Sequence, residues 1–573
     1  MEAQVMQGRR AGPHPPRVTT VDRMVVALAL CLFLTLACYQ LQLPGLHYDE
    51  AKEAGNNAVQ VLRGLPVRSF RGAELQVGSL HLPLMVQDYI GALNVYLALV
   101  PLALLGISPL ALRLVPVLLA SVTLTLLYLL GREISGRVAG VVTLLLVAVN
   151  PSFVFWSRQG IFVTNITATL AVASSLTAVR WYRHRRPRDL YLTAALWGLG
   201  IYAKLLFVWI IGATVGVWFL GRSVLALGSW QRNDRADGPT SGRRAPLLSH
   251  SGAAQLALAA VCFLVPLLPL ALFNLRTGGT FSSVLSNLDS SYYGVRNAAL
   301  SSNLVARLKQ VVVLFRGDHL WYLGARPANP VATWIAIGLL VAVLLLGLAR
   351  AVRNPSSQRR LGAWPLSLFF CLLVVVQSSF TVSDLFVTHY AILLPFVFLA
   401  VGTLVGQIVD RGGRLWLVPA LLAVVCWAGV DLWVTIQYHQ ALTATGGHAS
   451  HSDAIYEVAE YLDTNRVESP FVLDWGIEAP LVFLTAGRVQ PVEIFGYDRL
   501  DAPSEDVAER LRDTLDDPAV AYLFHVPEET VFGGRRELFD IVVAEAGLVP
   551  RIEAAFHERS GRMLYVLTRI ERP

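Results

Sequence analysis

Lysine is almost absent from this chain of 573 residues, and charged residues of both signs are scarce. Charged residues make up 15% of the sequence, 54% is hydrophobic, and the mean hydropathy is +0.53. This composition excludes an intrinsically disordered chain, and glycine without a three-residue period excludes a collagen. The five cysteines all lie inside apolar runs, where they pack as small hydrophobic residues. We therefore expect no disulfide-stapled module.

Several signatures of soluble enzymes are also missing. The sequence has no Walker loop, no G-x-G-x-x-G behind a strand, no H-E-x-x-H and no G-x-S-x-G. An activated group is therefore expected to arrive on a lipid. The net charge of +7 does not indicate a nucleic-acid partner, because the arginines form short clusters between apolar segments instead of one basic face.

Long apolar runs divide the first three quarters of the chain. We predict an α-helical polytopic membrane protein with about eleven spans plus interfacial helices. The runs cover residues 24–43, 109–130, 138–156, 161–180, 190–203, 206–221, 252–273, 331–349, 361–380, 390–408 and 415–436. The arginines of the tail 1–23 place the N-terminus in the cytoplasm of a multi-pass cell-membrane protein. A cleavable signal peptide is rejected, because the first run approaches full spanning length and lacks a small-x-small cleavage site.

Two segments need more than hydropathy. Residues 83–106 are apolar enough to span, but a crossing there would put two arginine clusters outside, against the positive-inside rule. We therefore predict an interfacial or re-entrant segment. Residues 190–221 carry Lys204 in the middle and arginines at both ends. Two short spans that meet near Lys204 keep its charge at the outer surface. A lysine at the centre of a span would instead cost roughly 2.5–3.5 kcal/mol.

Residues 437–573 have the composition of a soluble domain. Amphipathic helical patterns cover 453–464, 505–515 and 535–546, and strand-like runs cover 471–474, 520–524 and 563–568. We predict a small α/β domain that lies outside the membrane, after the transmembrane domain 24–436 with its external loops 44–108 and 274–330. Acceptor recognition and shielding of a site are both open roles for it. No site is assigned to Asp474, Trp475 or His525, because a buried Trp at a strand end is the simpler interpretation.

Ionisable residues are almost missing from the predicted spans, which argues against a proton relay through the bilayer. They gather at the outer ends of the spans. They are Asp49, Glu50, Arg68, Arg71, His81, Arg113, Arg158, Lys204, Asp318, His319, Arg326, Asp384 and His389. A site, if present, is therefore expected to face outward at the membrane surface, with Asp318, His319, Arg326, His389 and Tyr390 as candidate substrate-binding residues.

An acidic pair and two cations carry the candidate chemistry. Asp49 and Glu50 follow the first span, where they could act as a general base or hold a divalent cation against a phosphate. The competing interpretation is an acidic cap on the next helix. Arg158 and Lys204 lie at outer span ends, where they could bind a lipid phosphate, or extend to lipid headgroups.

The order of these motifs resembles the GT-C glycosyltransferases, most of all the protein mannosyltransferase and lipid A aminoarabinose transferase branch (glycosyltransferase family 39 type). The likeness covers roughly residues 20–410. The matching residues are Asp49-Glu50, His81-Leu82-Pro83, Arg113, Ser157-Arg158, Lys204 and His389-Tyr390. No acid follows Ser157-Arg158 in 161–165, and a Leu interrupts the usual His-Pro-Pro turn, which leaves the sugar, the acceptor and a metal requirement open.

The resemblance implies a membrane enzyme that transfers a sugar from a polyprenyl-phosphate donor to a lipid, glycan or protein acceptor on the extracytoplasmic side, with inversion. It implies Asp49 as the base, with Glu50 beside it. Donor phosphate binding falls to His81, Arg113, Arg158 and Lys204. A transporter or flippase of lipid-linked glycans is the alternative, but the sequence lacks the repeated halves that it predicts. A membrane anchor for a working C-terminal domain is the third hypothesis.

Overall fold

The structure is a computed structural model. It describes residues 19–67, 70–160, 164–233, 250–288, 296–353, 363–380, 385–497, 499–517 and 520–573. Most of the predicted cytoplasmic tail, and Arg68 and Asp384, lie outside the described residues.

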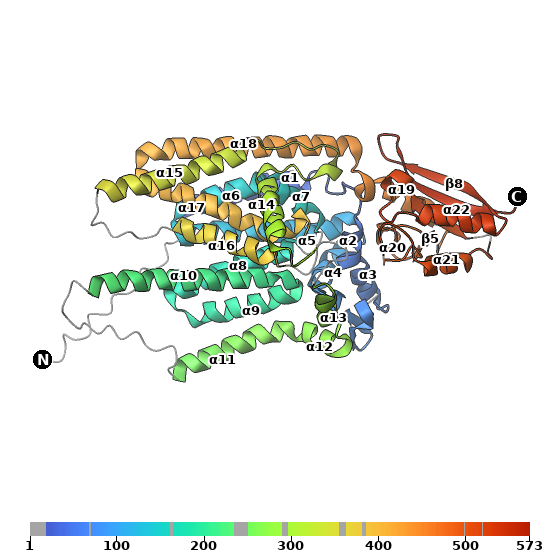
Figure 1. Cartoon of the computed structure of the whole chain (residues 1–573), viewed down its shortest axis with the longest axis horizontal. Coiled ribbons are helices and arrows are strands. Elements are labelled where there is room, and N and C mark those ends of the chain that lie inside the picture. The colour runs from blue at the N-terminus through green and yellow to red at the C-terminus, as the bar shows by residue number, and fades with distance from the viewer. Residues whose placement is uncertain are drawn as a thin grey trace.

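Long helices form a bundle in which most axes run nearly parallel (Figure 1). The helices are α1 (Thr20–Cys38), α5 (Pro109–Ser135), α6 (Arg137–Val149), α7 (Pro151–Gln159), α8 (Thr164–His184), α9 (Pro187–Ala203), α10 (Val208–Asn233), α11 (His250–Leu264), α12 (Leu268–Thr277), α15 (Ala332–Arg353), α16 (Ala363–Ser378), α17 (Leu394–Gly412) and α18 (Arg414–Thr445). Each predicted apolar run contains one or two of these helices, because a long apolar run satisfies its backbone groups in lipid by forming a helix. The predicted fold class is confirmed.

The number of crossings stays a prediction. Within the described residues, six helices are long and apolar enough to cross a membrane, and the bent pair α6 and α7, with an angle of 62°, makes seven if it is one span. Around Lys204, α9 has 17 residues and Leu205–Gly221 is one of the shorter apolar helices, and the two short spans there stay a prediction.

The described parts of residues 44–108 and 274–330 fold into shorter elements that connect the bundle helices. They contain α2 (Tyr48–Glu50), η1 (Ala51–Gly55), α3 (Asn56–Arg63), η2 (Phe70–Gly72), β1 (Glu74–Val77), β2 (Leu80–Pro83), β3 (Met85–Gln87), β4 (Ile90–Gly91), α4 (Leu93–Leu105), α13 (Gly279–Ser286), α14 (Leu300–Arg316) and η6 (Trp321–Leu323). The remaining 3-10 turns are η4 (Leu205–Phe207), η5 (Val265–Leu267) and η7 (Val387–Ile392). Helix α4 has 13 residues and is about 20 Å long, too short for a core of about 30 Å. This agrees with a segment that does not cross.

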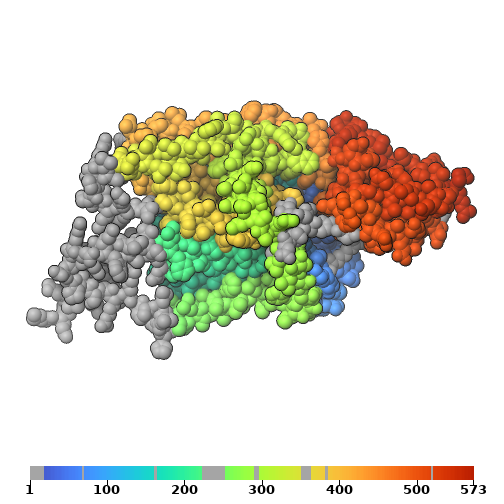
Figure 2. All heavy atoms as spheres, viewed as in Figure 1, coloured from blue at the N-terminus to red at the C-terminus, as the bar shows by residue number. Residues whose placement is uncertain are grey.

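The C-terminal domain extends from one end of the bundle (Figures 1 and 2). Its helices are α19 (Ala454–Thr464), α20 (Glu478–Leu484), α21 (Glu505–Arg512) and α22 (Arg535–Glu545), and its 3-10 turns are η8 (Ala449–His451) and η9 (Pro527–Glu529). Its strands β5 (Phe471–Val472), β6 (Val492–Glu493), β7 (Ala521–His525), β8 (Val549–His557) and β9 (Met563–Glu571) form one sheet in the order β6-β5-β7-β9-β8. The predicted helices and strands are all present, although α18 continues to Thr445, past the predicted boundary at 436.

The two ends of the bundle differ in what they carry. Helices α2, α3, α4, α12 and α13 lie at the end that bears the C-terminal domain, whereas α10 and α15 end at the opposite side (Figure 1). The last described residues of α10 and α15 therefore lie far from the domain. This arrangement is the one that the positive-inside rule requires if the domain lies outside.

Candidate functional site

The C-terminal end of α1 is held by a buried arginine. Arg158 of α7 is fully enclosed, and its two terminal nitrogens donate to the carbonyls of Leu36, Tyr39, Gln40 and Leu43 at 2.6–3.3 Å. The last carbonyls of a helix have no partner within the helix and need a donor from elsewhere. Arg158 supplies that donor from a distant part of the sequence.

A second buried arginine holds the segment that follows. Arg113 of α5 pairs with Glu50 through two hydrogen bonds, Nε to Oε2 and Nη2 to Oε1, both 2.8 Å long. Its remaining N–H groups donate to the carbonyls of Leu41, Pro44 and Gly45 at 2.9–3.1 Å. Both side chains of the ion pair are completely buried.

These contacts give Glu50, Arg113 and Arg158 different tasks from the expected ones. All five N–H groups of Arg113 donate to protein groups, and both terminal nitrogens of Arg158 donate to backbone carbonyls. Glu50 is committed to Arg113. The three residues fix the path of the chain between α1 and Asp49.

Asp49 lies at the centre of the site, in the turn formed by residues 47–50. His47 caps this turn, since its Nδ1 accepts the backbone N–H of Asp49 at 3.2 Å and its own N–H donates to Glu50. Asp49 is 7% exposed, and burial raises the pKa of its carboxyl to about 6, against the lowering effect of the Lys52 and Lys204 charges. Burial lowers the pKa of His47 to about 3, so its ring is neutral and forms no ion pair with Asp49 at 3.6 Å.

Lys204 reaches the same site from the junction of α9 and η4. Its backbone is extended there and pairs with Ile90 of β4, while the N–H of Leu205 donates to the carbonyl of Tyr89 at 3.0 Å. Gly91 permits this approach, because a Cβ on it would lie 2.2 Å from the carbonyl oxygen of Tyr202. Lys204 is 3% exposed, and burial lowers its pKa to about 8. The nearby carboxylates of Asp49 and Glu53 oppose this shift and keep the ammonium charged at neutral pH.

One turn of π-helix follows Asp49. Residues 51–55 form it, and such turns are frequent at functional sites because they redirect side chains. Glu53 is buried and its charge raises the pKa of Lys204, and Lys52 donates to the hydroxyl of Tyr48 at 2.6 Å. Sequence reasoning missed both roles.

The C-terminal domain covers this end of the site. The ring of Trp475 lies 4.9 Å from that of Tyr48 and 5.6 Å from that of His47, and the hydroxyl of Tyr497 lies 3.0 Å from the Tyr48 hydroxyl. His451 stacks on His47 at 4.2 Å between ring centres. No local pattern marks these residues, because their partners lie some 400 positions earlier in the chain.

The remaining predicted residues are distributed around the site. His389 of η7 is half-buried. Burial lowers its pKa most, and the charge of Lys204 lowers it further. Tyr390 is buried with its hydroxyl 2.7 Å from Ser378 Oγ. For the other four predicted residues, no contact with Asp49 is among those described. His81 Nδ1 lies 2.8 Å from Glu74 Oε1, and Asp318 Oδ2 lies 3.4 Å from Arg316 Nε. The ring of His319 packs on that of Trp156 with 5.0 Å between ring centres, and Arg326 is exposed.

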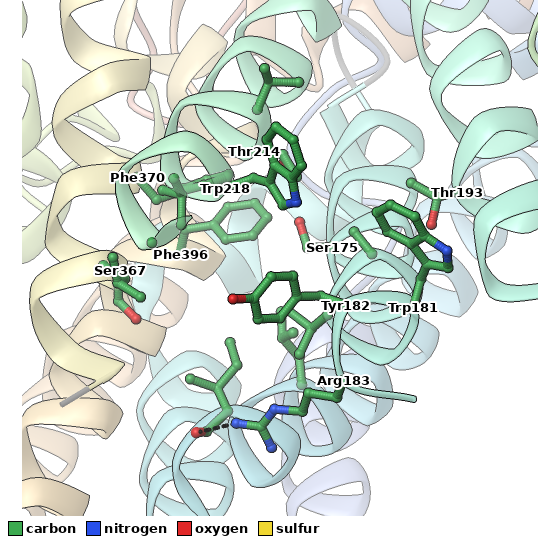
Figure 3. Close-up of a pocket in the computed structure, with 18 of the residues that line it drawn as sticks. Ser175, Trp181, Tyr182, Arg183, Thr193, Thr214, Trp218, Ser367, Phe370 and Phe396 are labelled. Atoms are coloured by element: carbon green, nitrogen blue, oxygen red, sulfur yellow. Dashed lines mark hydrogen bonds between the residues drawn. The ribbon is translucent and has the colours of Figure 1, made fainter. Parts of the chain in front are cut away.

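A cavity of about 730 Å³ lies elsewhere in the bundle, between α8, α9, α10, α16 and α17 (Figure 3). Its walls are apolar and aromatic, with Trp181, Tyr182, Trp218, Phe370 and Phe396 among the residues that line it. None of the predicted site residues belongs to its wall. The cavity is therefore separate from the Asp49 site.

The divalent cation considered for the acidic pair has no ready-made cage in the described part of the chain. No group of three or more His, Cys, Asp or Glu side chains is arranged there to hold a metal ion. Glu50 faces Arg113 and leaves Asp49 without a second carboxylate from that pair. A metal requirement stays a hypothesis.

Comparisons with known proteins agree with this architecture. The model of the family described as dolichyl-phosphate-mannose-protein mannosyltransferase matches residues 93–229. No curated protein matches the sequence. The apo structure of ArnT from Cupriavidus metallidurans is similar with a TM-score of 0.59 at 12% identity, over 95% of this chain and 97% of that chain. The structure of ArnT from the same organism bound to undecaprenyl phosphate has a TM-score of 0.52 at 13% identity, over 96% of this chain and 98% of that chain.

Because the first of these likenesses extends over nearly the full length of both chains, it includes the C-terminal domain as well as the bundle. The chain therefore has the GT-C glycosyltransferase fold of the protein mannosyltransferase and ArnT type, which confirms the resemblance read from its motifs.

Proposed function

We propose that this protein is an integral membrane glycosyltransferase that moves a sugar from a polyprenyl-phosphate donor to an acceptor hydroxyl on the extracytoplasmic side, with inversion. The observation that carries the proposal is the burial of both Asp49 and Lys204, with the charge of each acting on the pKa of the other. The family-model match and the fold shared with ArnT support a lipid-linked donor, since one of the ArnT structures has undecaprenyl phosphate bound.

The chemistry needs one displacement. Asp49 takes the proton of the acceptor hydroxyl as its oxygen forms a bond to the anomeric carbon, and the bond from that carbon to the phosphate oxygen breaks. The polyprenyl phosphate leaves with the electron pair, and Lys204 stabilises its negative charge as a fixed cation in a site of low dielectric. A single displacement from the opposite face inverts the anomeric carbon.

The direct test is a transfer assay with the full-length protein in lipid vesicles. Undecaprenyl-phosphate mannose and undecaprenyl-phosphate arabinose serve as donors, with lipid, glycan and peptide acceptors offered in turn. We expect release of undecaprenyl phosphate together with labelled acceptor from at least one pair. If every pair gives only the rate of protein-free vesicles, the proposed transfer with these donors is wrong.

Replacing Lys204 with Met is expected to weaken donor binding. The variant loses the buried ammonium charge that would interact with the donor phosphate. The KM for the donor should therefore rise about tenfold or more, which corresponds to a loss of about 1.4 kcal/mol in binding free energy. Lys309→Met is the matched control, because Lys309 is one of the three lysines of the chain and is exposed on α14. An unchanged KM for Lys204→Met would exclude the phosphate role.

The rate should follow a bell-shaped pH profile. Asp49 acts as a base only when deprotonated, and its pKa of about 6 places the acid limb there instead of near the ordinary value of 3.8. Lys204 loses its charge above a pKa of about 8, so the rate should fall again at higher pH.

The Lys204→Met variant gives this profile a signed control. The lysine charge lowers the pKa of Asp49, so its removal should move the acid limb of kcat to higher pH. A limb that stays below about pH 5, the range of an ordinary carboxyl, would contradict a buried base.

A further inference from the structure

Three stacked rings join the site to the C-terminal domain. The ring of His451, in η8, lies between Tyr322 at 4.0 Å and His47 at 4.2 Å, with interplanar angles of 18° and 20°. Tyr322 belongs to η6, and His47 caps the turn that carries Asp49. Three separate parts of the chain thus meet in one stack, with the domain's residue at its centre.

Hydrogen bonds tie the same stack to Glu50. Gln159 of α7 lies at their junction, since it accepts from the Tyr322 hydroxyl at 3.0 Å and its Nε2 lies 3.2 Å from His451 Nδ1 and 3.4 Å from Glu50 Oε1. Burial keeps the pKa of His451 well below its ordinary value, so the ring is neutral and its Nδ1 can accept from the amide. The stack and the Arg113–Glu50 pair therefore hold the Asp49 turn from two sides.

Close backbone approach around the stack shows that the two domains are fitted to each other here. A Cβ on Gly45 would lie 2.0 Å from the carbonyl oxygen of Ser452, the residue after His451. Farther along, a Cβ on Gly55 would lie 2.6 Å from the ring of Phe483, and Asn56 donates to the carbonyl of Ala479 at 3.1 Å. The segment that carries Asp49 is thus packed on the C-terminal domain along its length.

We propose that His451 is a positioning residue: its ring, stacked on His47, lets the C-terminal domain fix the turn that presents Asp49 to the acceptor. This inference rests on the proposed function, in which Asp49 is the base. It gives the domain a role other than acceptor recognition or shielding, because the site in the bundle is incomplete without it.

Two substitutions separate the ring from its hydrogen bond. His451→Asn removes the ring and keeps an acceptor for Gln159, whereas His451→Phe keeps a ring and removes the acceptor. His557→Asn, on the exposed side of β8, is the matched control within the same domain. Each full-length variant is reconstituted in vesicles, its thermal unfolding is recorded, and kcat and KM are measured with the undecaprenyl-phosphate sugar that the unmodified protein accepts.

We expect His451→Asn to lower kcat about 10- to 100-fold, because a misplacement of about 1 Å can cost 10²-fold, with a KM for the donor within about twofold of the unmodified protein. Its acid limb should move below pH 6, since a loosened turn admits water to Asp49 and reverses part of the burial effect. His451→Phe and the control should keep most of kcat and the original limb.

Three outcomes would overturn the proposal: an unchanged kcat in His451→Asn, a reduced kcat with an unmoved acid limb, or a folded His451→Phe that is as slow as His451→Asn. Should His451→Asn fail to fold, the folded His451→Phe decides: it should keep most of kcat and an acid limb near pH 6, and a loss of about 10-fold or more in kcat would overturn the proposal. These results differ from a failure of the proposed function. In that case the Asp49→Asn variant would retain transfer, whatever the His451 variants do.

Discussion

Replacing Asp49 with Asn is expected to lower the rate of sugar transfer by about 10²- to 10⁴-fold, the range that a positioned general base contributes. Asn has nearly the same shape as Asp but cannot take a proton from the acceptor hydroxyl. It also removes a buried charge whose burial raises the pKa of Asp49, so the variant should fold at least as well as the unmodified protein. The loss should therefore fall on kcat, with the KM for the donor little changed.

The measurement compares initial rates of undecaprenyl phosphate release with thermal unfolding of the same preparation. Asp540→Asn is the matched control, because Asp540 is exposed on α22 and pairs only with Arg536 at 3.3 Å among the described salt bridges. It should keep the full rate. Transfer by Asp49→Asn within a few-fold of the control would remove Asp49 as the base.

Replacing Arg113 with Met is expected to destabilise the fold by about 3–5 kcal/mol, the usual cost of removing one partner of a buried ion pair. The change leaves the Glu50 carboxylate buried without its cation, and it also leaves the carbonyls of Leu41, Pro44 and Gly45 without their donor. Thermal unfolding in detergent should show a large drop in midpoint, with less protein recovered from membranes.

An exposed pair in the same chain provides the comparison. Arg551 and Glu571 lie 2.8 Å apart at the surface, and surface pairs contribute about 0–1 kcal/mol, so Arg551→Met should barely move the midpoint. The double variant Arg113→Met with Glu50→Gln should recover part of the loss, because no unpaired buried charge remains. A midpoint of Arg113→Met equal to that of Arg551→Met would contradict a structural role for the pair.

The two expected results concern neighbouring residues, one with an effect on transfer and the other with an effect on folding stability. Asp49 should be dispensable for folding and essential for transfer, whereas the buried pair of Glu50 and Arg113 should contribute mainly to stability. The acidic cap that competed with the catalytic interpretation describes Glu50 well, since its side chain completes the cap with the backbone N–H of His47. The catalytic interpretation is proposed for Asp49 alone.

The sequence by itself determined the helices of the bundle, the elements of the C-terminal domain and the GT-C type. These features follow from local patterns, because a long apolar run must form a helix in lipid and alternating patterns define amphipathic elements. The position of Asp49 just after the first span likewise follows from a local pattern, the end of the first apolar run. That residues 83–106 do not cross stays a prediction, which rests on the arginine clusters 131–137 and 181–189 that a crossing would place outside.

Only the tertiary structure shows which groups Arg113 and Arg158 bind. Arg113, Arg158 and Lys204 each lie at the end of a helix, and a guanidinium there suits a phosphate or a row of backbone carbonyls equally well. The carbonyls that Arg113 and Arg158 bind lie 68 to 122 positions earlier in the chain, and His451 meets His47 across some 400 positions. Donors and acceptors so far apart are paired by packing, which no local pattern of residues records.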